Sequence, residues 1–275
     1  MTEQLAPDYG RAGRNLPAAI AVGVGLLAIV GLSLAYSLLF FALLVAGFML
    51  LAVRELLTAM TDELPSAVKF IVTIAAPIIV MSGFWGGADA LIASFVSAVL
   101  LVLTVRLPFG QEKYVSNVSR AIFMLVYAPL MAGFAVMLAD SENGAKKVLA
   151  LVLLTAATDI GGYISGVLFG SHPMAPKISP KKSWEGFAGA LLLQIGTGCA
   201  LWIWAFDKPW WQGAIVGIIM TITATIGDLV ESMIKRDLGI KDMSALLPGH
   251  GGVMDRLDSL VVNAFVAWAL FTLFL

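Results

Sequence analysis

The residue types that could do chemistry are concentrated near the end of the chain, between Asp228 and Ser259. This stretch combines carboxylates, lysines and arginines with the turn Pro-Gly-His-Gly-Gly, which contains His250, Gly251 and Gly252. The segments around it are almost entirely apolar. A cluster of acids, bases and glycines at the end of an apolar segment predicts a metal and phosphate site at a membrane surface.

Helical spacing gathers the acids of this stretch into two sets. Residues at i, i+3, i+4 and i+7 share one helix face, and the first set has that spacing: Asp228, Glu231, Ser232 and Lys235. The second set follows the glycine turn as Asp255, Asp258 and Ser259. We expect two helices to bring both carboxylate faces to one point. Mg²⁺ suits such a point, because one or two carboxylates usually hold it together with water and substrate phosphates.

The remaining parts of the stretch are suited to anions. Glycines let backbone N–H groups approach a phosphate, and a helix N-terminus adds a favourable dipole. The cations are Lys235, Arg236, Lys241 and Arg256. Together these groups are the parts of a phosphoryl or nucleotidyl transfer site. The alternative is a salt-bridged loop with residues 235–242 as a solvated helical face. With two histidines, one cysteine and no Cys–His spacing, neither a zinc site nor a nucleophile triad is expected.

Composition places the chain in a membrane. Hydrophobic residues make up 60% of it and charged residues 13%, against about 25% charged residues in soluble domains. A spanning helix needs about 20 apolar residues, which predicts an all-α polytopic membrane protein with about nine transmembrane helices. The expected spans are 17–34, 36–53, 69–85, 88–105, 121–139, 148–169, 187–206, 211–230 and 258–275, and the first two pairs are expected to form helical hairpins.

The placement of basic residues predicts the orientation. With nine spans and a cytoplasmic N-terminus, only Lys146, Lys147 and Lys208 of the 17 Lys and Arg residues lie outside. Cytoplasmic loops carry the excess of Lys and Arg, so this topology is favoured. It puts loops 171–186 and 231–257 on the cytoplasmic face. The prediction is therefore a multi-pass protein of the cell inner (plasma) membrane with its active site at the cytoplasmic ends of the C-terminal helices.

The two halves of the chain differ in kind. Residues 1–147 form five expected packing and lipid-facing spans, whereas 148–275 form the expected catalytic region of the same integral domain. The sixth span contains Asp159, which is either a wall of the substrate site or a partner in an ion pair or hydrogen bond to another helix. Glycines recur every fourth residue in that span, at Gly162, Gly166 and Gly170. Such spacing predicts close approach of a neighbouring helix.

The loop 171–186 has three prolines, which exclude regular helix, and Ser183 before Trp184 is typical of a helix start. Its lysines, Lys177, Lys181 and Lys182, could bind phosphate. Charge alone favours a positive-inside anchor with Trp184 as an interfacial aromatic residue. The proximity of the charged stretch 228–259 favours phosphate binding instead.

At these residues the sequence resembles the phosphatidate cytidylyltransferase (CDP-diacylglycerol synthase) family. The family's C-terminal signature is present as Ser232, Lys235, Arg236, Lys241, Asp242, Pro248, His250, Gly251, Gly252, Asp255, Arg256 and Asp258. The segment 179–186 and Asp159 with residues 161–163 are similar to two further family segments. The motifs cover residues 150–260, and the first half is similar in hydropathy alone.

The resemblance implies condensation of CTP with phosphatidate to CDP-diacylglycerol and pyrophosphate, dependent on Mg²⁺, with a second cation left open. It implies catalytic roles for Lys235, Arg236, Asp258, His250 and Asp159. It implies binding of CTP and phosphate by Ser179, Lys181, Lys182, Trp184, Ser232, Lys241, Gly251, Gly252 and Arg256. It implies metal binding by Asp228, Asp255 and Glu231. No nucleic-acid partner is expected, and a homodimer is left open.

Two other classes of function share some of these features. A CDP-archaeol synthase or a CTP-dependent polyprenol kinase would use the same parts on another lipid. An ion-coupled transporter could use Asp159 and Asp228 as ion sites, but it would need polar residues that continue across the bilayer, and the first five expected spans have almost none.

Overall fold

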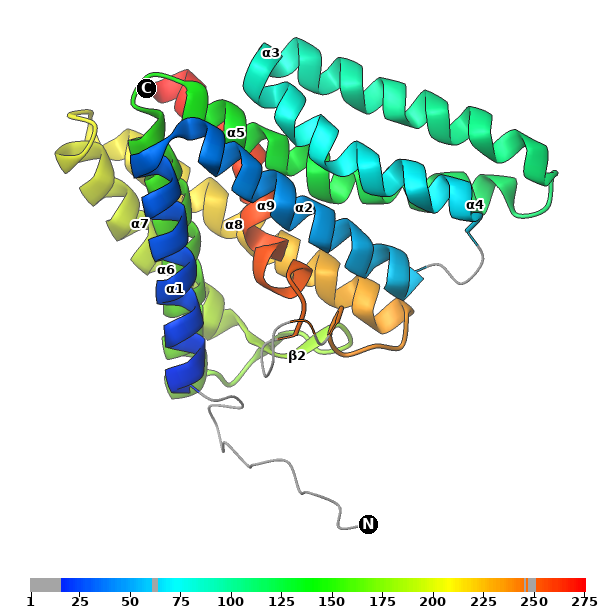
Figure 1. The fold of residues 1–275 in the computed structure, drawn as a ribbon. Helices are drawn as coiled ribbons and strands as arrows, with labels where there is room; N and C mark the ends of the chain where they lie inside the picture. Colours follow the sequence, from blue (N-terminus) through cyan, green and yellow to red (C-terminus); the bar gives the residue numbers. More distant parts are fainter. Residues whose placement is uncertain (1–15, 61–63, 245, 247–250) are drawn as a thin grey trace.

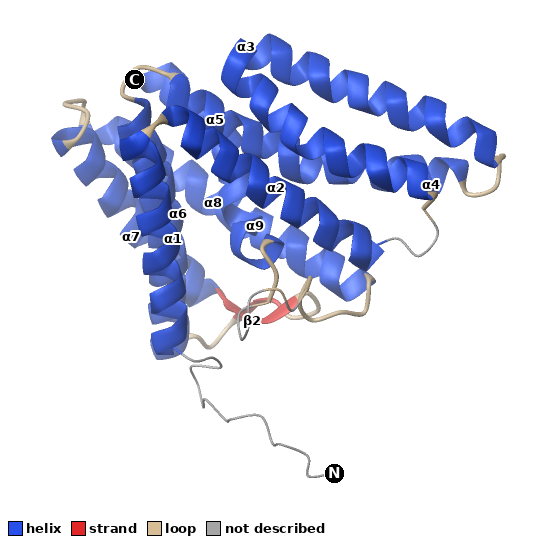
Figure 2. Ribbon diagram, viewed as in Figure 1, coloured by secondary structure: helices blue, strands red, loops and turns tan. Residues whose placement is uncertain are grey.

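The computed structural model describes residues 16–60, 64–244, 246 and 251–275. It is a bundle of long helices with one small β-hairpin at one end (Figure 1, Figure 2). In chain order the elements are α1 (Leu16–Tyr36), α2 (Leu38–Met60), α3 (Ser66–Arg106), η2 (Leu107–Phe109), α4 (Tyr114–Leu125), η3 (Val126–Leu130), α5 (Met131–Asp140), α6 (Gly144–Phe169), β1 (Pro173–Ala175), β2 (Ser179–Ser183), α7 (Trp184–Trp204), α8 (Trp210–Asp237) and α9 (Met254–Phe274).

In the described part of the chain, seven helical stretches are long and apolar enough to cross a membrane. They are Leu38–Met60, Ser66–Phe109, Tyr114–Asp140, Gly144–Phe169, Trp184–Trp204, Trp210–Asp237 and Met254–Phe274, and Gly23–Tyr36 of α1 adds a shorter apolar stretch. This confirms a predominantly helical polytopic membrane protein. Of the two expected spans not among the seven, one is α1, whose apolar stretch is the shorter one, and the other has a physical origin in α3.

Helix α3 folds back on itself at Gly87. This residue has φ 60° and ψ −150°, a backbone conformation that glycine adopts without the penalty of a Cβ atom. The hydroxyls of Ser82 and Ser94 lie 2.7 Å apart, although a straight helix would separate residues twelve apart by about 18 Å. Figure 1 shows the two arms running side by side. The arms match the expected spans 69–85 and 88–105, so the second predicted helical hairpin is present within one long element.

The fifth expected span, 121–139, is longer and less regular in the structure. It begins at Tyr114 as α4 and continues through the π-helical turn η3 into α5. Pro129 lies within η3, and because proline lacks a backbone N–H it cannot complete the regular helical hydrogen bonding.

Close packing of α6 through α9 forms the frame of the C-terminal half. A Cβ atom on Gly161 would lie 2.7 Å from the carbonyl oxygen of Gly189, so no larger residue would allow this approach of α6 to α7. The close approach to α7 predicted for this span is present, but its tightest point is Gly161, whereas a Cβ on the predicted Gly162 would make only an ordinary contact, at 3.7 Å from Ala190 Cβ. Buried side chains also hydrogen-bond between helices: Thr221 donates to Gln194 at 3.0 Å, and Asn263 connects Thr223 and Thr155. These contacts satisfy polar groups that water cannot reach.

The loop after α6 forms an antiparallel β-hairpin, in which Pro173 pairs with Ser183 and Ala175 with Ser179. Strands were not expected here, although the exclusion of helix was correct. Ser183 then caps α7, since its hydroxyl accepts a hydrogen bond from the Gly186 N–H at 3.1 Å. The hairpin lies at the end of the bundle where α8 ends and α9 begins (Figure 1).

Candidate active site

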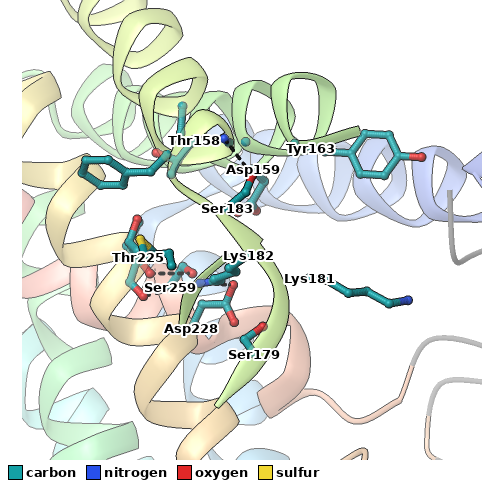
Figure 3. Close-up of a pocket in the computed structure, with 17 residues that line it drawn as sticks. Thr158, Asp159, Tyr163, Ser179, Lys181, Lys182, Ser183, Thr225, Asp228 and Ser259 are labelled. Carbon is teal, nitrogen blue, oxygen red and sulfur yellow. Dashed lines mark hydrogen bonds and ion pairs between the residues drawn. The ribbon is translucent and has the colours of Figure 1, made fainter. Parts of the chain in front are cut away.

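A polar cavity of about 280 Å³ opens at this end of the bundle. Residues from α6, β2, α7, α8 and α9 line it (Figure 3). Among the residues predicted from sequence, its walls include Asp159, Ser179, Lys181, Lys182 and Asp228. Residues far apart in the chain therefore form one site at the helix ends.

Lys182 and Asp228 form an ion pair within this cavity. The Lys182 ammonium lies 2.7 Å from Asp228 Oδ2 and 3.5 Å from the Thr225 carbonyl oxygen. Its neighbour Lys181 extends away from Lys182 (Figure 3). Lys182 is thus directed at the site, while Lys181 is exposed at its edge.

A second cluster of charged side chains is centred on Lys235. Its ammonium lies 2.5 Å from Glu231 Oε2 and 2.8 Å from Asp255 Oδ1. The other oxygen of Asp255 accepts hydrogen bonds from the N–H groups of Gly252 at 2.7 Å and Met243 at 2.9 Å. Both oxygens of Asp255 are therefore engaged within the protein. Glu231 is 1% exposed, and its buried Oε1 has no hydrogen-bond partner among the residues that the structure describes.

Helices α8 and α9 meet next to Asp228. A Cβ on Gly227 would lie 2.8 Å from the Asp258 carbonyl oxygen, and Ser259 donates to the Ala224 carbonyl oxygen at 3.1 Å. The Asp258 carboxylate accepts the N–H of Ser259 at 2.7 Å. The two helices thus pack closely at this level, with Asp228 paired to Lys182 and Asp255 paired to Lys235.

The structure distinguishes among the three predicted metal ligands, all of which it describes. Asp228 lines the polar cavity, whereas Asp255 and Glu231 hold Lys235 outside it. No group of three or more His, Cys, Asp or Glu side chains is arranged around a common point in the described ranges. Asp159 and Asp228 both line the cavity, and two carboxylates with substrate phosphates are a donor set that suits Mg²⁺.

Other residues named by the sequence take varied positions. Arg236 is exposed and its Nε donates to the Ile178 carbonyl oxygen at 3.2 Å, which ties α8 to the β-hairpin. Ser232 donates to Asp228 Oδ1 at 3.4 Å. Lys241 is exposed, as is Trp184 at 57%.

The glycine turn is described from Gly251 onward, and His250 lies outside the described residues. Gly251 has φ 77°, a left-handed conformation that favours glycine. The N–H of Gly252 is used by Asp255. In this arrangement the turn positions Asp255.

Sequence reasoning missed Glu55, which comes from α2 in the first half of the chain. This residue is 6% exposed and accepts hydrogen bonds from Ser244, Val253 and Met254 at the start of α9. The available signal was a carboxylate within an apolar span, which is costly unless it has partners. Its partners are too distant in the chain for any local pattern to reveal them.

A second cavity, of about 230 Å³, lies between α1, α2, α5, α6 and α9. Its walls are largely aliphatic and aromatic, with Phe41, Leu44 and Leu257 among them. Arg256 and Asp159 supply charge, and Asp159 lines the polar cavity as well. The apolar cavity therefore adjoins the polar one at Asp159.

Comparison with known proteins decides the family. Residues 17–274 match the Cytidylyltransferase family. The chain belongs to this family. Among curated members, it is 40% identical to the phosphatidate cytidylyltransferase of Mycobacterium bovis, with 98% of this chain and 93% of that protein covered. It is 37% identical to the Mycobacterium leprae protein of the same name, with 98% of this chain and 92% of that protein covered. It is 35% identical to that of Staphylococcus haemolyticus, with 81% of this chain and 85% of that protein covered. The resemblance noted from the C-terminal motifs thus extends over nearly the whole cytidylyltransferase chain.

Proposed function

We propose that this cytidylyltransferase condenses CTP with phosphatidate to form CDP-diacylglycerol and pyrophosphate. The names of its relatives supply the substrates. The observation in the structure that carries the proposal is the Lys182–Asp228 pair, which places a cation and a carboxylate in one polar cavity beside an apolar one. A nucleotide and a lipid need these two environments.

The reaction requires two anions to be held together. A phosphate oxygen of phosphatidate attacks the α-phosphorus of CTP, a new P–O bond forms, and the bond to the bridging oxygen of the β-phosphate breaks. A phosphate monoester has a second pKa of about 6, so the attacking oxygen is already ionised near neutral pH and needs no strong base. The protein therefore contributes positioning and cations, which offset repulsion and stabilise the departing pyrophosphate.

We assign the triphosphate of CTP to the polar cavity. Lys182 would bind a phosphate there, and Ser179 and Ser183 on the same strand offer hydroxyl groups to it. Asp228, with Asp159, would hold Mg²⁺. When bound, this cation supplies positive charge to the phosphates, the contribution that metals make in phosphoryl transfer.

We assign the acyl chains of phosphatidate to the apolar cavity. The walls of the cavity are about as apolar as the bilayer interior that the chains leave, so the chains can enter it at little cost. Arg256 at its wall supplies positive charge for the lipid phosphate, and Asp159 marks where the two cavities adjoin. The lipid headgroup would then meet CTP at this boundary.

The proposed topology has nine spans. It counts α1, the two arms of α3 and the six other long helices, with the N-terminus and the site on the cytoplasmic side of the plasma membrane. The excess of Lys and Arg on that side supports it. A homodimer stays a prediction.

The deciding experiment is an assay of purified protein with labelled CTP, phosphatidate and Mg²⁺. CDP-diacylglycerol and pyrophosphate should appear in equal amounts, and ATP in place of CTP should give little product. Parallel reactions with a phosphorylated archaeal ether lipid and with a polyprenol test the two related lipid enzymes. Faster turnover of either lipid than of phosphatidate, or no product from CTP, would overturn the assignment.

A further inference from the structure

Glu55 connects the first half of the chain to the loop that precedes α9. We propose that Glu55 is a positioning residue for nucleotidyl transfer: it holds residues 252–254 in place, and through them it fixes Asp255 and Lys235. This inference rests on the proposed function. It assigns the first half of the chain a part in the site, where sequence alone indicated packing.

The contact is made by both oxygens of one buried carboxylate. Oε1 accepts from the Ser244 hydroxyl at 2.6 Å and from the Val253 N–H at 2.8 Å. Oε2 accepts from the Met254 N–H at 2.9 Å. The first N–H groups of a helix have no partner within it, so Glu55 caps α9 from a distant helix. Its negative charge also lies at the positive end of the α9 dipole.

Gly252 packs directly against the Glu55 carboxylate, and there is no room for a side chain at position 252. A Cβ atom at position 252 would lie 2.6 Å from Glu55 Oε2 and 2.8 Å from Oε1. The glycine therefore lets the chain pass over Glu55, a reason for its presence that differs from the predicted contact with phosphate. These two explanations make opposite predictions for a paired substitution.

Residues 252–254 are linked to Lys235 through a single residue, Asp255. The Gly252 N–H donates to Asp255 Oδ2 at 2.7 Å, and Asp255 Oδ1 lies 2.8 Å from the Lys235 ammonium. The same Lys235 binds Glu231 on α8. A shift of residues 252–254 would therefore move Asp255 and release Lys235. Lys235 ties α9 to the end of α8, the helix that carries the cavity residue Asp228 seven positions earlier, so this shift would disturb the cavity itself. Displacements of about 1 Å can cost about 100-fold in rate.

The chemistry of the side chain explains why an acid is needed. Three donors meet one group, and a carboxylate has two acceptor oxygens with free lone pairs, whereas glutamine has one acceptor oxygen and an NH₂ that can only donate. Glu55→Gln would place that NH₂ against an N–H or a hydroxyl. Glu55→Asp keeps the charge and both oxygens but shortens the side chain by one methylene group.

The first test measures kcat and KM for CTP in Glu55→Gln, Glu55→Asp, Ser244→Ala and the exposed control Glu142→Gln. We expect kcat of Glu55→Gln to fall by about 10- to 100-fold, the range typical of residues that orient a functional group, with KM for CTP little changed. Glu55→Asp and Ser244→Ala should fall less, and Glu142→Gln should match the wild type.

The second test pairs Glu55 with Gly252. Gly252→Ala should lower kcat, because the added methyl group pushes against the carboxylate. Glu55→Asp withdraws the carboxylate, so Glu55→Asp/Gly252→Ala should be more active than Gly252→Ala alone. If Gly252 serves only to admit a phosphate, the double variant will show no recovery, and the inference is wrong.

A purely structural role gives a different result. In that case the activity of Glu55→Gln would fall in proportion to the amount of folded protein, and kcat per folded molecule would equal that of the wild type, which overturns the inference. The wild type run in parallel separates the two claims. An inactive wild type refutes the proposed function, whereas an active wild type with an equally active Glu55→Gln refutes only the role of Glu55.

Discussion

Lys182 on β2 and Asp228 on α8 are joined by a 2.7 Å ion pair inside the polar cavity. The pair connects the hairpin after α6 to the acidic face of α8, the two segments that carry the family motifs. Its neighbour Lys181 lines the edge of the cavity but extends away from it (Figure 3). The two adjacent lysines therefore provide a matched comparison.

Lys182→Ala should raise KM for CTP more than Lys181→Ala does. Removing a charged hydrogen-bond donor costs about 1.5–3 kcal/mol, which corresponds to about a 10- to 100-fold change. The KM for phosphatidate should change less than the KM for CTP. Steady-state kinetics with each substrate varied in turn measures both, and equal effects of the two substitutions on CTP would contradict the position assigned to Lys182.

Asp228→Asn should abolish most turnover while the protein still folds. The carboxamide has the same shape but lacks the charge that would hold Mg²⁺ and pair with Lys182. A metal ion contributes several kcal/mol of charge stabilisation, so we expect kcat to fall by about 100-fold or more. Asp140→Asn, an exposed acid at the end of α5, is the control. Near-normal turnover at saturating Mg²⁺ would count against the metal role.

Filling the apolar cavity should affect the lipid substrate selectively. Leu44 on α2 lines this cavity, whereas the adjacent Leu43 is exposed on the outer face of the helix. Leu44→Trp should raise KM for long-chain phosphatidate by about tenfold or more, because fitting a chain beside the larger side chain costs about 1–3 kcal/mol of overpacking. Short-chain phosphatidate and CTP should be less affected. An equal effect of Leu43→Trp would show that the cavity does not receive the acyl chains.

Enlarging Gly161 should loosen the frame that carries the site. A methyl group there would lie 2.7 Å from a carbonyl oxygen of α7, and overpacking of this kind costs about 1–3 kcal/mol. Gly161→Ala should therefore lower the thermal unfolding temperature in detergent. Gly47→Ala, where a Cβ atom meets nothing within 4 Å, is the control, and similar unfolding temperatures for both would refute the packing argument.

Features set by local spacing could be predicted from the sequence. The apolar segments, the cap at Ser183 and the glycine contact between α6 and α7 follow from residue types a few positions apart. The shared face of Asp228, Glu231, Ser232 and Lys235 is also local, and it appears as the Ser232–Asp228 and Lys235–Glu231 contacts.

Features set by distant contacts could not be predicted. Spacing placed Asp228 and Asp255 on equal terms, but the structure gives Asp228 to the cavity and surrounds Asp255 with Lys235, Gly252 and Met243. Glu55 reaches its partners across most of the chain. The strand at Ser179–Ser183 was missed because its charged residues and proline lack the apolar alternation by which strands are recognised.

The central claim is that nucleotide and metal meet at Asp228 and Lys182. The most direct measurement is an experimental structure with CTP and Mn²⁺, in which anomalous scattering locates the metal. We predict Mn²⁺ bound to Asp228 and to phosphate oxygens of CTP, with Lys182 contacting the triphosphate. Mn²⁺ held by Asp255 and Glu231 away from the cavity, or CTP bound elsewhere, would contradict this account.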